Sequence, residues 1–179
     1  MMFIENNGFG LRAIELEDLD WLKNLRNNST TWKNLETVVP LSMNLQNNWF
    51  KKLNETSSSE YFVFTNENDE NIGLVRITDI DYVNRKACIG LDINIEYRGK
   101  KLAVIGYNLI FDYLFNYKNM NRLFLFVIET NIIAINLYNK IGFVEEGRQR
   151  EAIIRNDRKI DYIMMSILAS EFRRLNSDE

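Results

Sequence analysis

The spacing of apolar residues in the first third of the chain predicts a short strand followed by two amphipathic helices. Residues 9–14 alternate between apolar and polar positions, as in a half-buried strand, and residues 15–26 repeat leucine at helical spacing. A break at residues 27–31 separates this helix from a second one, which is predicted after Pro40 with Ser42 as its N-cap. The apolar stripe expected along the second helix consists of Leu45, Trp49 and Leu53.

The rest of the chain predicts six further strands and two further helices. Residues 122–128 are almost continuously apolar, which is typical of a central strand covered on both faces. Asn156 and Asp157 form a turn-competent pair, so the last two strands are expected to form a hairpin. The order of elements predicts one mixed α/β domain over residues 1–179. The strands are predicted at residues 61–65, 72–80, 86–95, 122–128, 143–154 and 159–168, and the helices at residues 100–117 and 131–140.

A short basic loop joins the strand at residues 86–95 to the helix that begins near Lys100. It contains Gly99 and the cations Arg98, Lys100 and Lys101. First-turn N–H groups of a helix have no intrahelical acceptor, and the helix dipole favours an anion beside them. The junction therefore predicts a phosphate-binding site. The alternative is an ordinary strand-to-helix turn with solvated lysines.

Composition narrows the classes of function. The chain has 179 residues, of which 46% are apolar and 26% are charged, as expected for one globular domain with a sizeable core. Its net charge is −3 and it has no basic tract, so nothing in the sequence indicates binding to nucleic acid or to an anionic membrane. Small molecules and proteins remain as substrates or partners.

The chain has one cysteine, Cys88, and no histidine. No internal disulfide can form, the commonest general base is missing, and no metal site is expected, because the sequence has no Cys/His ligand pattern. Cys88 lies in an apolar run and is expected to be a buried small side chain rather than a nucleophile. Residues 1–10 lack the pattern of a secretory signal, and no apolar run approaches the ~20 residues that span a bilayer. We therefore expect a cytoplasmic protein.

Two motifs resemble those of the GCN5-related N-acetyltransferases (the GNAT family). Residues 98–103 resemble the family's pyrophosphate loop, Arg/Gln-x-x-Gly-x-Gly/Ala: Arg98 and Ala103 fit the pattern, whereas Lys101 stands at the middle glycine. A lysine is strained there if the position needs a positive φ. Residues 131–143 resemble the signature Asn-x-x-Ala-x-x-Leu-Tyr-x-Lys-x-Gly-Phe at every named position.

The resemblance covers residues 9–168 and has implications for the fold and the branch. The GNAT fold is a single α/β domain (mixed α+β) with a central, mostly antiparallel sheet and flanking helices, and the predicted order of elements agrees with it. Leu25-Arg26-Asn27-Asn28 and the later Trp49-Phe50 are similar to the RimJ/RimL-like branch of ribosomal-protein-alanine acetyltransferases. That branch also includes spermidine acetyltransferases and an amino-sugar-nucleotide acetyltransferase.

The resemblance implies an acetyl-CoA-dependent N-acetyltransferase in which a primary amine attacks the thioester directly. In GNAT enzymes the thioester lies beside the strand that ends at the pyrophosphate loop, and a backbone N–H of that strand polarises its carbonyl. Two asparagines resemble positions that hydrogen-bond the cofactor, and one of them, Asn131, is alternatively a helix cap. The cofactor-binding residues implied in this way are Leu91, Asp92, Ile93, Arg98, Gly99, Lys100, Lys101, Leu102, Ala103, Asn131 and Asn136.

The resemblance also implies catalytic and acceptor-binding residues. Tyr138 is the candidate acid that protonates the departing thiolate, against a packing aromatic as the alternative. The base is expected to be Glu129, at the carboxyl end of a central strand, or Asp92, or a water relay without a single base. The candidate acceptor-binding residues are Arg26, Trp32 and Trp49, with ordinary helix packing as the alternative for both tryptophans.

The sequence leaves the acceptor open among a protein N-terminus, a polyamine and an amino-sugar nucleotide. A polyamine site would need converging carboxylates, for which Glu36 and Glu55 are candidates, whereas a nucleotide-sugar site could use Arg26 with the tryptophans. A homodimer is also left open as the oligomeric state. The alternative function is a non-catalytic GNAT-fold module that binds CoA or a protein partner, and the lysine at position 101 favours it.

Overall fold

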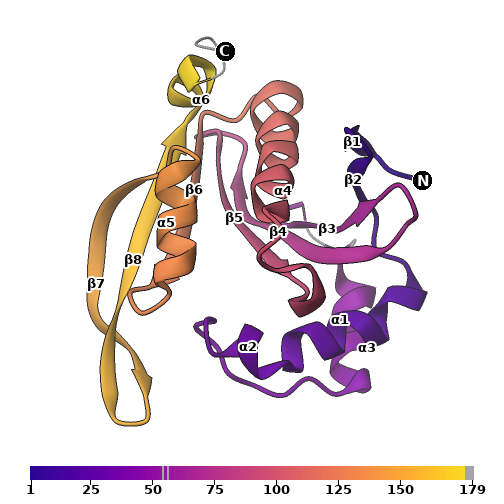
Figure 1. The fold of residues 1–179 in the computed structure, drawn as a ribbon, viewed down its shortest axis with the longest axis horizontal. Coiled ribbons are helices and arrows are strands. Elements are labelled where there is room, and N and C mark those ends of the chain that lie inside the picture. The colour runs from indigo at the N-terminus through magenta and orange to yellow at the C-terminus, as the bar shows by residue number, and fades with distance from the viewer. Residues whose placement is uncertain (54, 56, 176–179) are drawn as a thin grey trace.

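In the part of the chain that the structure describes, residues 1–53, 55 and 57–175, eight strands form one sheet (Figure 1). The structure is a computed structural model. The strands lie in the order β1-β2-β3-β4-β5-β6-β8-β7, and β5 and β6 are the parallel pair in an otherwise antiparallel sheet. The strands are β1 (Ile4–Asn6), β2 (Phe9–Arg12), β3 (Glu60–Asn66), β4 (Asn71–Asp81), β5 (Lys86–Ile93), β6 (Arg122–Ile128), β7 (Val144–Arg155) and β8 (Arg158–Leu168). The helices are α1 (Leu19–Asn27), α2 (Ser29–Trp32), α3 (Met43–Lys52), α4 (Leu102–Phe111), α5 (Ile132–Lys140) and α6 (Ala169–Leu175).

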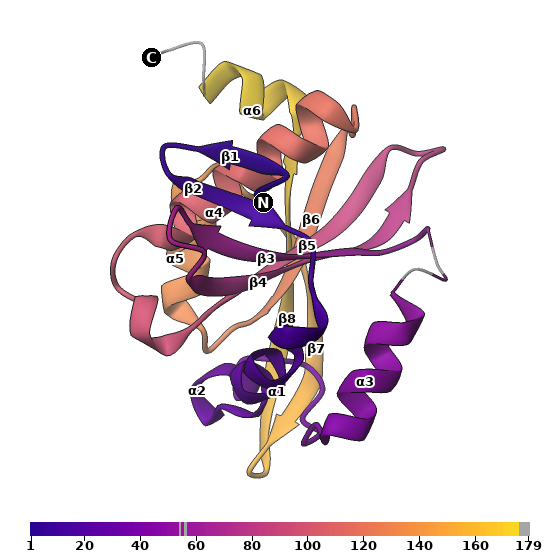
Figure 2. The same cartoon turned by 90° about the vertical axis from the view of Figure 1, so that its right-hand side faces the viewer.

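Different helices cover the two faces of the sheet, because side chains alternate along each strand. Phe64 and Val75 point into the main core under α4, whereas their neighbours Val63 and Leu74 pack in the smaller core with α1 and α3. Figure 2 shows α4 on one side of β3 and β4, and α1 and α3 on the other. The mixed α/β architecture with a mostly antiparallel sheet and flanking helices is therefore confirmed.

The parallel strands β5 and β6 pair over a short distance and then separate (Figure 1). Their ladder runs from the pair Lys86 and Arg122 to the pair Cys88 and Phe124. Beyond it, residues 89–93 of β5 continue along β4, while the rest of β6 pairs with β8. β5 and β6 are therefore paired at one end and separated at the other. In the separated part, no described pairing joins the edges of β5 and β6 that face each other.

Most predicted strands agree with the observed strands to within two residues, and the structure corrects some details. The strand predicted to end at residue 95 ends at Ile93, because a 3-10 turn over Ile95–Tyr97 follows it. The helix predicted from residue 15 begins as a 3-10 turn over Leu16–Asp18 and becomes α-helical at Leu19. The helix predicted from residue 100 begins at Leu102 and ends in a π-helical segment, Asp112–Tyr117. The short elements β1, α2 and α6 are additions to the predicted order.

The buried stripe of α3 also differs from the prediction. Leu45 is exposed, and Gln46 is the buried residue of this helix. Gln46 lies three and four positions before Trp49 and Phe50, which are half-buried against the sheet, so the stripe starts one residue later than hydrophobicity suggests. Among the described residues, no helix is both long and apolar enough to cross a membrane.

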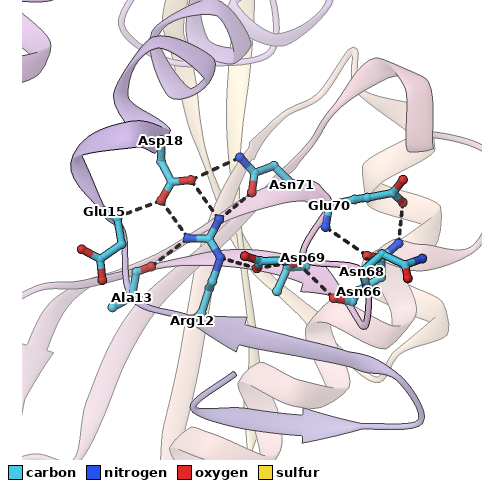
Figure 3. Close-up of polar contacts among 10 residues, drawn as sticks. Arg12, Ala13, Glu15, Asp18, Asn66, Asn68, Asp69, Glu70 and Asn71 are labelled. Atoms are coloured by element: carbon cyan, nitrogen blue, oxygen red, sulfur yellow. Dashed lines mark hydrogen bonds and ion pairs between the residues drawn. The ribbon is translucent and has the colours of Figure 1, made fainter. Parts of the chain in front are cut away.

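Arg12, at the end of β2, ties the N-terminal helices to the sheet (Figure 3). Its guanidinium donates to the two carboxylate oxygens of Asp18 at 2.7 and 2.9 Å, to Asn71 at 2.7 Å and to Asp69 at 2.8 Å. The side chains of Arg12 and Asp18 are 11% and 6% exposed. Burial alone would raise the pKa of Asp18, but hydrogen bonds from Arg12, the Glu15 N–H and Asn71 lower it below its ordinary value. The ion pair therefore fixes where the chain enters α1.

Replacing Arg12 with leucine should lower the free energy of unfolding at pH 7 by about 3 kcal/mol, because Asp18 is left buried without its partner. Urea denaturation measures this loss. The folded pKa of Asp18 lies below its ordinary value of 3.8, so the stabilisation is complete above that pH and is lost as the pH falls through the folded pKa. The difference between wild type and variant should shrink accordingly in acid.

Lys159→Leu is the matched control, since it removes an ion pair with Glu151 whose side chains are 62% and 59% exposed. It should change the free energy of unfolding by less than about 0.5 kcal/mol. Equal losses in the two variants would contradict a special role for Arg12.

Candidate active site

A pocket of about 450 Å³ lies where β5 and β6 separate. Phe126 and Tyr162 line one side, with their rings stacked at 5.2 Å, and residues 34–37 contribute to another. Because Phe126 faces this pocket, β6 is fully covered on one face only, which corrects the prediction of a strand covered on both faces. The side chains of β4 and β5 that point away from α4 form the facing wall, which comprises Arg76, Thr78, Cys88, Gly90 and Asp92.

Asp92 lies between two arginines in this wall. Its Oδ1 accepts a hydrogen bond from Arg76 Nη2 at 3.2 Å, and its Oδ2 lies 3.8 Å from Arg26 Nη1. The side chain of Asp92 is 11% exposed, and those of Arg76 and Arg26 are 32% and 27% exposed. The nearby carboxylate raises the pKa of Arg76 above its ordinary value and outweighs the opposing effect of burial, so this arginine stays charged.

Gly90 provides the space that Arg76 occupies. The two residues are partners in the register of β4 and β5, and a Cβ at Gly90 would lie 2.9 Å from Arg76 Nη2. A larger residue at position 90 would therefore displace the guanidinium. The glycine and the arginine form one unit of the pocket wall.

Tyr138 of α5 lies against Tyr107 of α4. Tyr107 Oη donates to Tyr138 Oη at 3.4 Å, and the two rings meet edge to face with centroids 5.7 Å apart. Because the Tyr138 oxygen accepts this bond, its own proton remains available to a ligand. Burial raises the pKa of Tyr138, and the hydrogen bond from Tyr107 offsets only part of that rise. The phenol is therefore protonated at neutral pH and can donate a proton.

The basic loop adjoins the same pocket, and its backbone is left-handed at two positions. Gly99 and Lys101 have φ values of +76° and +62°, and α4 begins directly afterwards at Leu102. Position 101 thus has the positive φ that would strain a lysine, by about 1 kcal/mol. The first-turn N–H groups of α4 are presented beside Ala103, which lines the pocket. An anionic group can bind there.

Arg98 has a different position from the one expected of a phosphate ligand. Its Nε donates to the Ile93 carbonyl at 2.8 Å, its Nη1 to Thr30 Oγ1 at 2.8 Å and its Nη2 to Thr31 Oγ1 at 2.9 Å. The side chain ties the loop to the end of β5 and to α2. Arg98 therefore positions the loop, and the backbone N–H groups with Lys100 and Lys101 are the groups left for an anion.

The structure brings much of the predicted site together around this pocket. Asn131 is at its edge and caps α5, since its side chain accepts a hydrogen bond from the Ala134 N–H at 3.3 Å. Both roles considered for Asn131 are thus compatible with its place. The predicted residues that line the pocket are Arg26, Leu91, Asp92, Ile93, Arg98, Ala103, Asn131 and Tyr138, and Gly99, Lys100, Lys101 and Leu102 form the adjoining loop.

Two predicted acceptor-binding residues, Trp32 and Trp49, are outside the described lining of this pocket. Trp49 packs edge to face on Tyr61, with ring centroids 5.2 Å apart, in the core under α1 and α3. The packing alternative is therefore correct for Trp49, because α3 turns its aromatic stripe toward the sheet. Asn136 also lies outside the described lining, on the exposed side of α5.

Glu129 is separated from the pocket as well. Its carboxylate accepts a hydrogen bond from the Asp161 N–H at 3.0 Å and lies 3.7 Å from Arg148. It borders a different groove, which it shares with Arg155. Of the two carboxylates considered as a base, the structure brings Asp92 and not Glu129 to the pocket that contains Tyr138.

Sequence analysis missed Arg76 and Tyr107. The sequence could have indicated Arg76, because it is the only charged residue between Ile72 and Thr78 in an otherwise apolar predicted strand. The sequence could not have indicated Tyr107, since an aromatic residue in an apolar helix cannot be distinguished from an ordinary core residue. Its contact with Tyr138 depends on how α4 and α5 pack.

Lys101→Gly should raise the free energy of unfolding by about 0.5–1 kcal/mol, because glycine adopts a positive φ without strain. Lys100→Gly is the control: position 100 has no positive φ, so glycine there should lower stability by a similar amount. Thermal or urea unfolding distinguishes the two. The affinity for acetyl-CoA should be unchanged or higher in Lys101→Gly, and a large loss would show instead that the ammonium group contacts a phosphate.

Known proteins resemble this chain over most of its length. The family described as acetyltransferase (GNAT) domain matches residues 11–164. Spermidine N(1)-acetyltransferase of Vibrio cholerae is 32% identical over 174 residues, which cover 97% of this chain and 99% of that protein. The enzyme of the same name from Escherichia coli K12 is 31% identical over 163 residues, which cover 90% of this chain and 87% of that protein.

A crystal structure of the Vibrio cholerae spermidine N-acetyltransferase in complex with CoA and spermine has a TM-score of 0.89 with this chain at 32% identity. The match covers 94% of this chain and 99% of that one. The assignment to the RimJ/RimL-like branch stays a prediction, because these relatives are named as spermidine acetyltransferases. Since the family match spans most of the chain and the relatives match it over nearly their whole length, this protein belongs to the GNAT family of acetyltransferases and is an N-acetyltransferase.

Proposed function

We propose that this enzyme transfers the acetyl group of acetyl-CoA directly to a small-molecule primary amine in the pocket between β5 and β6. The observation that carries the proposal is the meeting of three groups from three elements, β5, α4 and α5, at one pocket. They are the protonated phenol of Tyr138, the carboxylate of Asp92 and the anion-binding start of α4. Direct acyl transfer from a thioester to an amine needs an acid, a proton acceptor and a site for the donor's diphosphate.

The residues of this chain fit acetyl-CoA as the donor substrate. The diphosphate can accept hydrogen bonds from the first-turn N–H groups of α4, and Lys100 and Lys101 add positive charge beside them. At residues 91–93, the edge of β5 that faces β6 is not paired with that strand, so its backbone N–H and C=O groups can bind the pantetheine arm. CoA in the related Vibrio cholerae structure supports the same assignment.

Tyr138 and Asp92 divide the proton transfers between them. As the amine nitrogen forms its bond to the carbonyl carbon, the C–S bond breaks and Tyr138 protonates the departing thiolate. Asp92 accepts the proton released by the amine, directly or through water. With a pKa above its ordinary value of 10, Tyr138 keeps its proton until this step, and transfer of that proton to a thiolate of pKa ~8.5 is uphill by at least about 2 kcal/mol.

The acceptor is proposed to be a small molecule rather than a protein N-terminus. The names of two relatives, and the spermine in the solved structure, make spermidine and spermine the first acceptors to test. Protein N-termini and amino-sugar nucleotides remain predictions from sequence.

Purified protein should release CoA from acetyl-CoA in the presence of an amine acceptor, and Tyr138→Phe should lower kcat by about tenfold to hundredfold. The affinity for acetyl-CoA, measured by calorimetric titration, should stay the same because the ring is retained. Tyr117→Phe, at an exposed tyrosine, is the control and should retain full kcat. An unchanged kcat in Tyr138→Phe would remove this residue from the role of acid.

Asp92→Asn and Glu129→Gln distinguish the two candidate bases. Asp92→Asn should lower kcat/KM for the amine by at least about tenfold, because the pocket loses its buried proton acceptor. Glu129→Gln should leave kcat/KM within about twofold, since its carboxylate borders another groove. The opposite pattern, measured by initial rates, would restore Glu129 as the base.

A further inference from the structure

We infer that the acceptor amine carries an anionic group, a carboxylate or a phosphate, which Arg76 and Arg26 bind in the pocket. The inference rests on the proposed function and names its substrate class. It follows from how the arginines of this chain are partnered.

The arginines of this chain differ in how many hydrogen bonds they donate to described protein groups. Arg12 and Arg98, which have structural roles, each donate several short hydrogen bonds to fixed acceptors. In contrast, Arg76 donates to one described acceptor, Asp92, at 3.2 Å, and its Nε is buried without a partner in the described chain. Arg26 approaches the same carboxylate no closer than 3.8 Å. Two guanidinium groups therefore share a single carboxylate and retain donors for a ligand.

The wall together with the neighbouring Arg26 carries a net positive charge. Arg26, Arg76 and Asp92 together carry one net positive charge, and Arg98 is held by threonine and backbone oxygens. Glu36, the second carboxylate of the lining, is exposed and belongs to the loop of residues 34–37 rather than to the wall. A second anion supplied by the acceptor would balance the two arginines, as charge complementarity requires in a partly buried site.

The chain makes specific room for this cation. The Arg76 guanidinium lies over Gly90, where any Cβ would come within 2.9 Å of Nη2. It lines the same pocket as Tyr138, the proposed acid. A guanidinium held in this position repels a polycation and attracts the anionic group of an amine that carries one.

A substrate of this class also accounts for the position of Asp92 next to Arg26 and Arg76. A substrate with both an ammonium and an anionic group needs one negative and one positive partner side by side. Asp92 and Arg76 provide that pair on adjacent strands. The carboxylate receives the amine, and the guanidinium groups receive the anion.

Four acceptors test this: 6-aminohexanoate, 5-aminopentyl phosphate, 1,5-diaminopentane and spermidine. The first three differ only in the group at the far end of one chain, and the two anions separate a carboxylate source from a phosphate source. With wild type, kcat/KM for at least one anionic amine should exceed that for 1,5-diaminopentane and spermidine by about tenfold or more. Mass spectrometry of the acetylated products measures all four.

Arg76→Gln should remove this preference, mainly through a higher KM for the anionic amine, so that kcat/KM falls much more for the anionic amine than for 1,5-diaminopentane. Arg76→Lys keeps the charge and should restore part of the preference, which separates recognition from misfolding. Arg150→Gln removes the same charge on exposed β7 and is the matched control, with no change expected.

Each outcome decides between the alternatives. Preference for spermidine or 1,5-diaminopentane overturns the inference and leaves the proposed acetyltransferase standing. An equal loss for anionic and cationic far ends in Arg76→Gln overturns it as well. No acetylation of any of the four amines by a protein that binds acetyl-CoA also overturns it, whereas failure to bind acetyl-CoA overturns the proposed function itself.

Discussion

The active site depends on the early end of the parallel ladder between β5 and β6. Three residue pairs hold the strands together, and beyond Cys88 and Phe124 each strand follows a different neighbour. Since a continuous sheet would fill this space with hydrogen bonds, the separation is what creates both the pocket and an edge of backbone groups along it. Gly106 lets α4 approach β5 closely, since a Cβ there would lie 2.6 Å from Leu91, so the start of α4 is held near the opening.

Arginine serves three separate purposes in this chain, and the number of protein acceptors distinguishes them. Arg12 is saturated by carboxylate and amide oxygens and fastens α1 to the sheet. Arg98 is saturated by hydroxyl and carbonyl oxygens and fixes the phosphate loop. Arg76 is left largely unsaturated in a pocket. A family motif identifies Arg98, but its hydrogen bonds to threonine and backbone oxygens leave the backbone N–H groups of the loop as the candidates to bind an anion.

Much of the site could be predicted because its signals are local. The strand, the positive-φ loop and the start of α4 are adjacent in sequence, and so are Asn131 and Tyr138 within one signature, so chain connectivity already brings the members of each group together. Trp32 and Trp49 lie outside the described lining of the pocket, and their placement depends on packing rather than on local sequence. The direction of Trp49 is set by how α3 rotates on the sheet, and apolar spacing alone placed its stripe one residue too early. The choice between Asp92 and Glu129 likewise depends on which groove each strand end faces.

The sequence by itself determined the order of the longer elements, the family and many local conformations, because hydrophobic period, caps and turn residues act over a few residues. It determined that the loop before α4 would favour an anion, since that property belongs to any helix start. Only the tertiary structure decided that Arg26, Arg76 and Asp92 meet, that Tyr107 hydrogen-bonds Tyr138, and that Glu129 lies apart. These contacts join residues on different elements, and their existence depends on strand register and on the separation of β5 from β6, which no local pattern encodes.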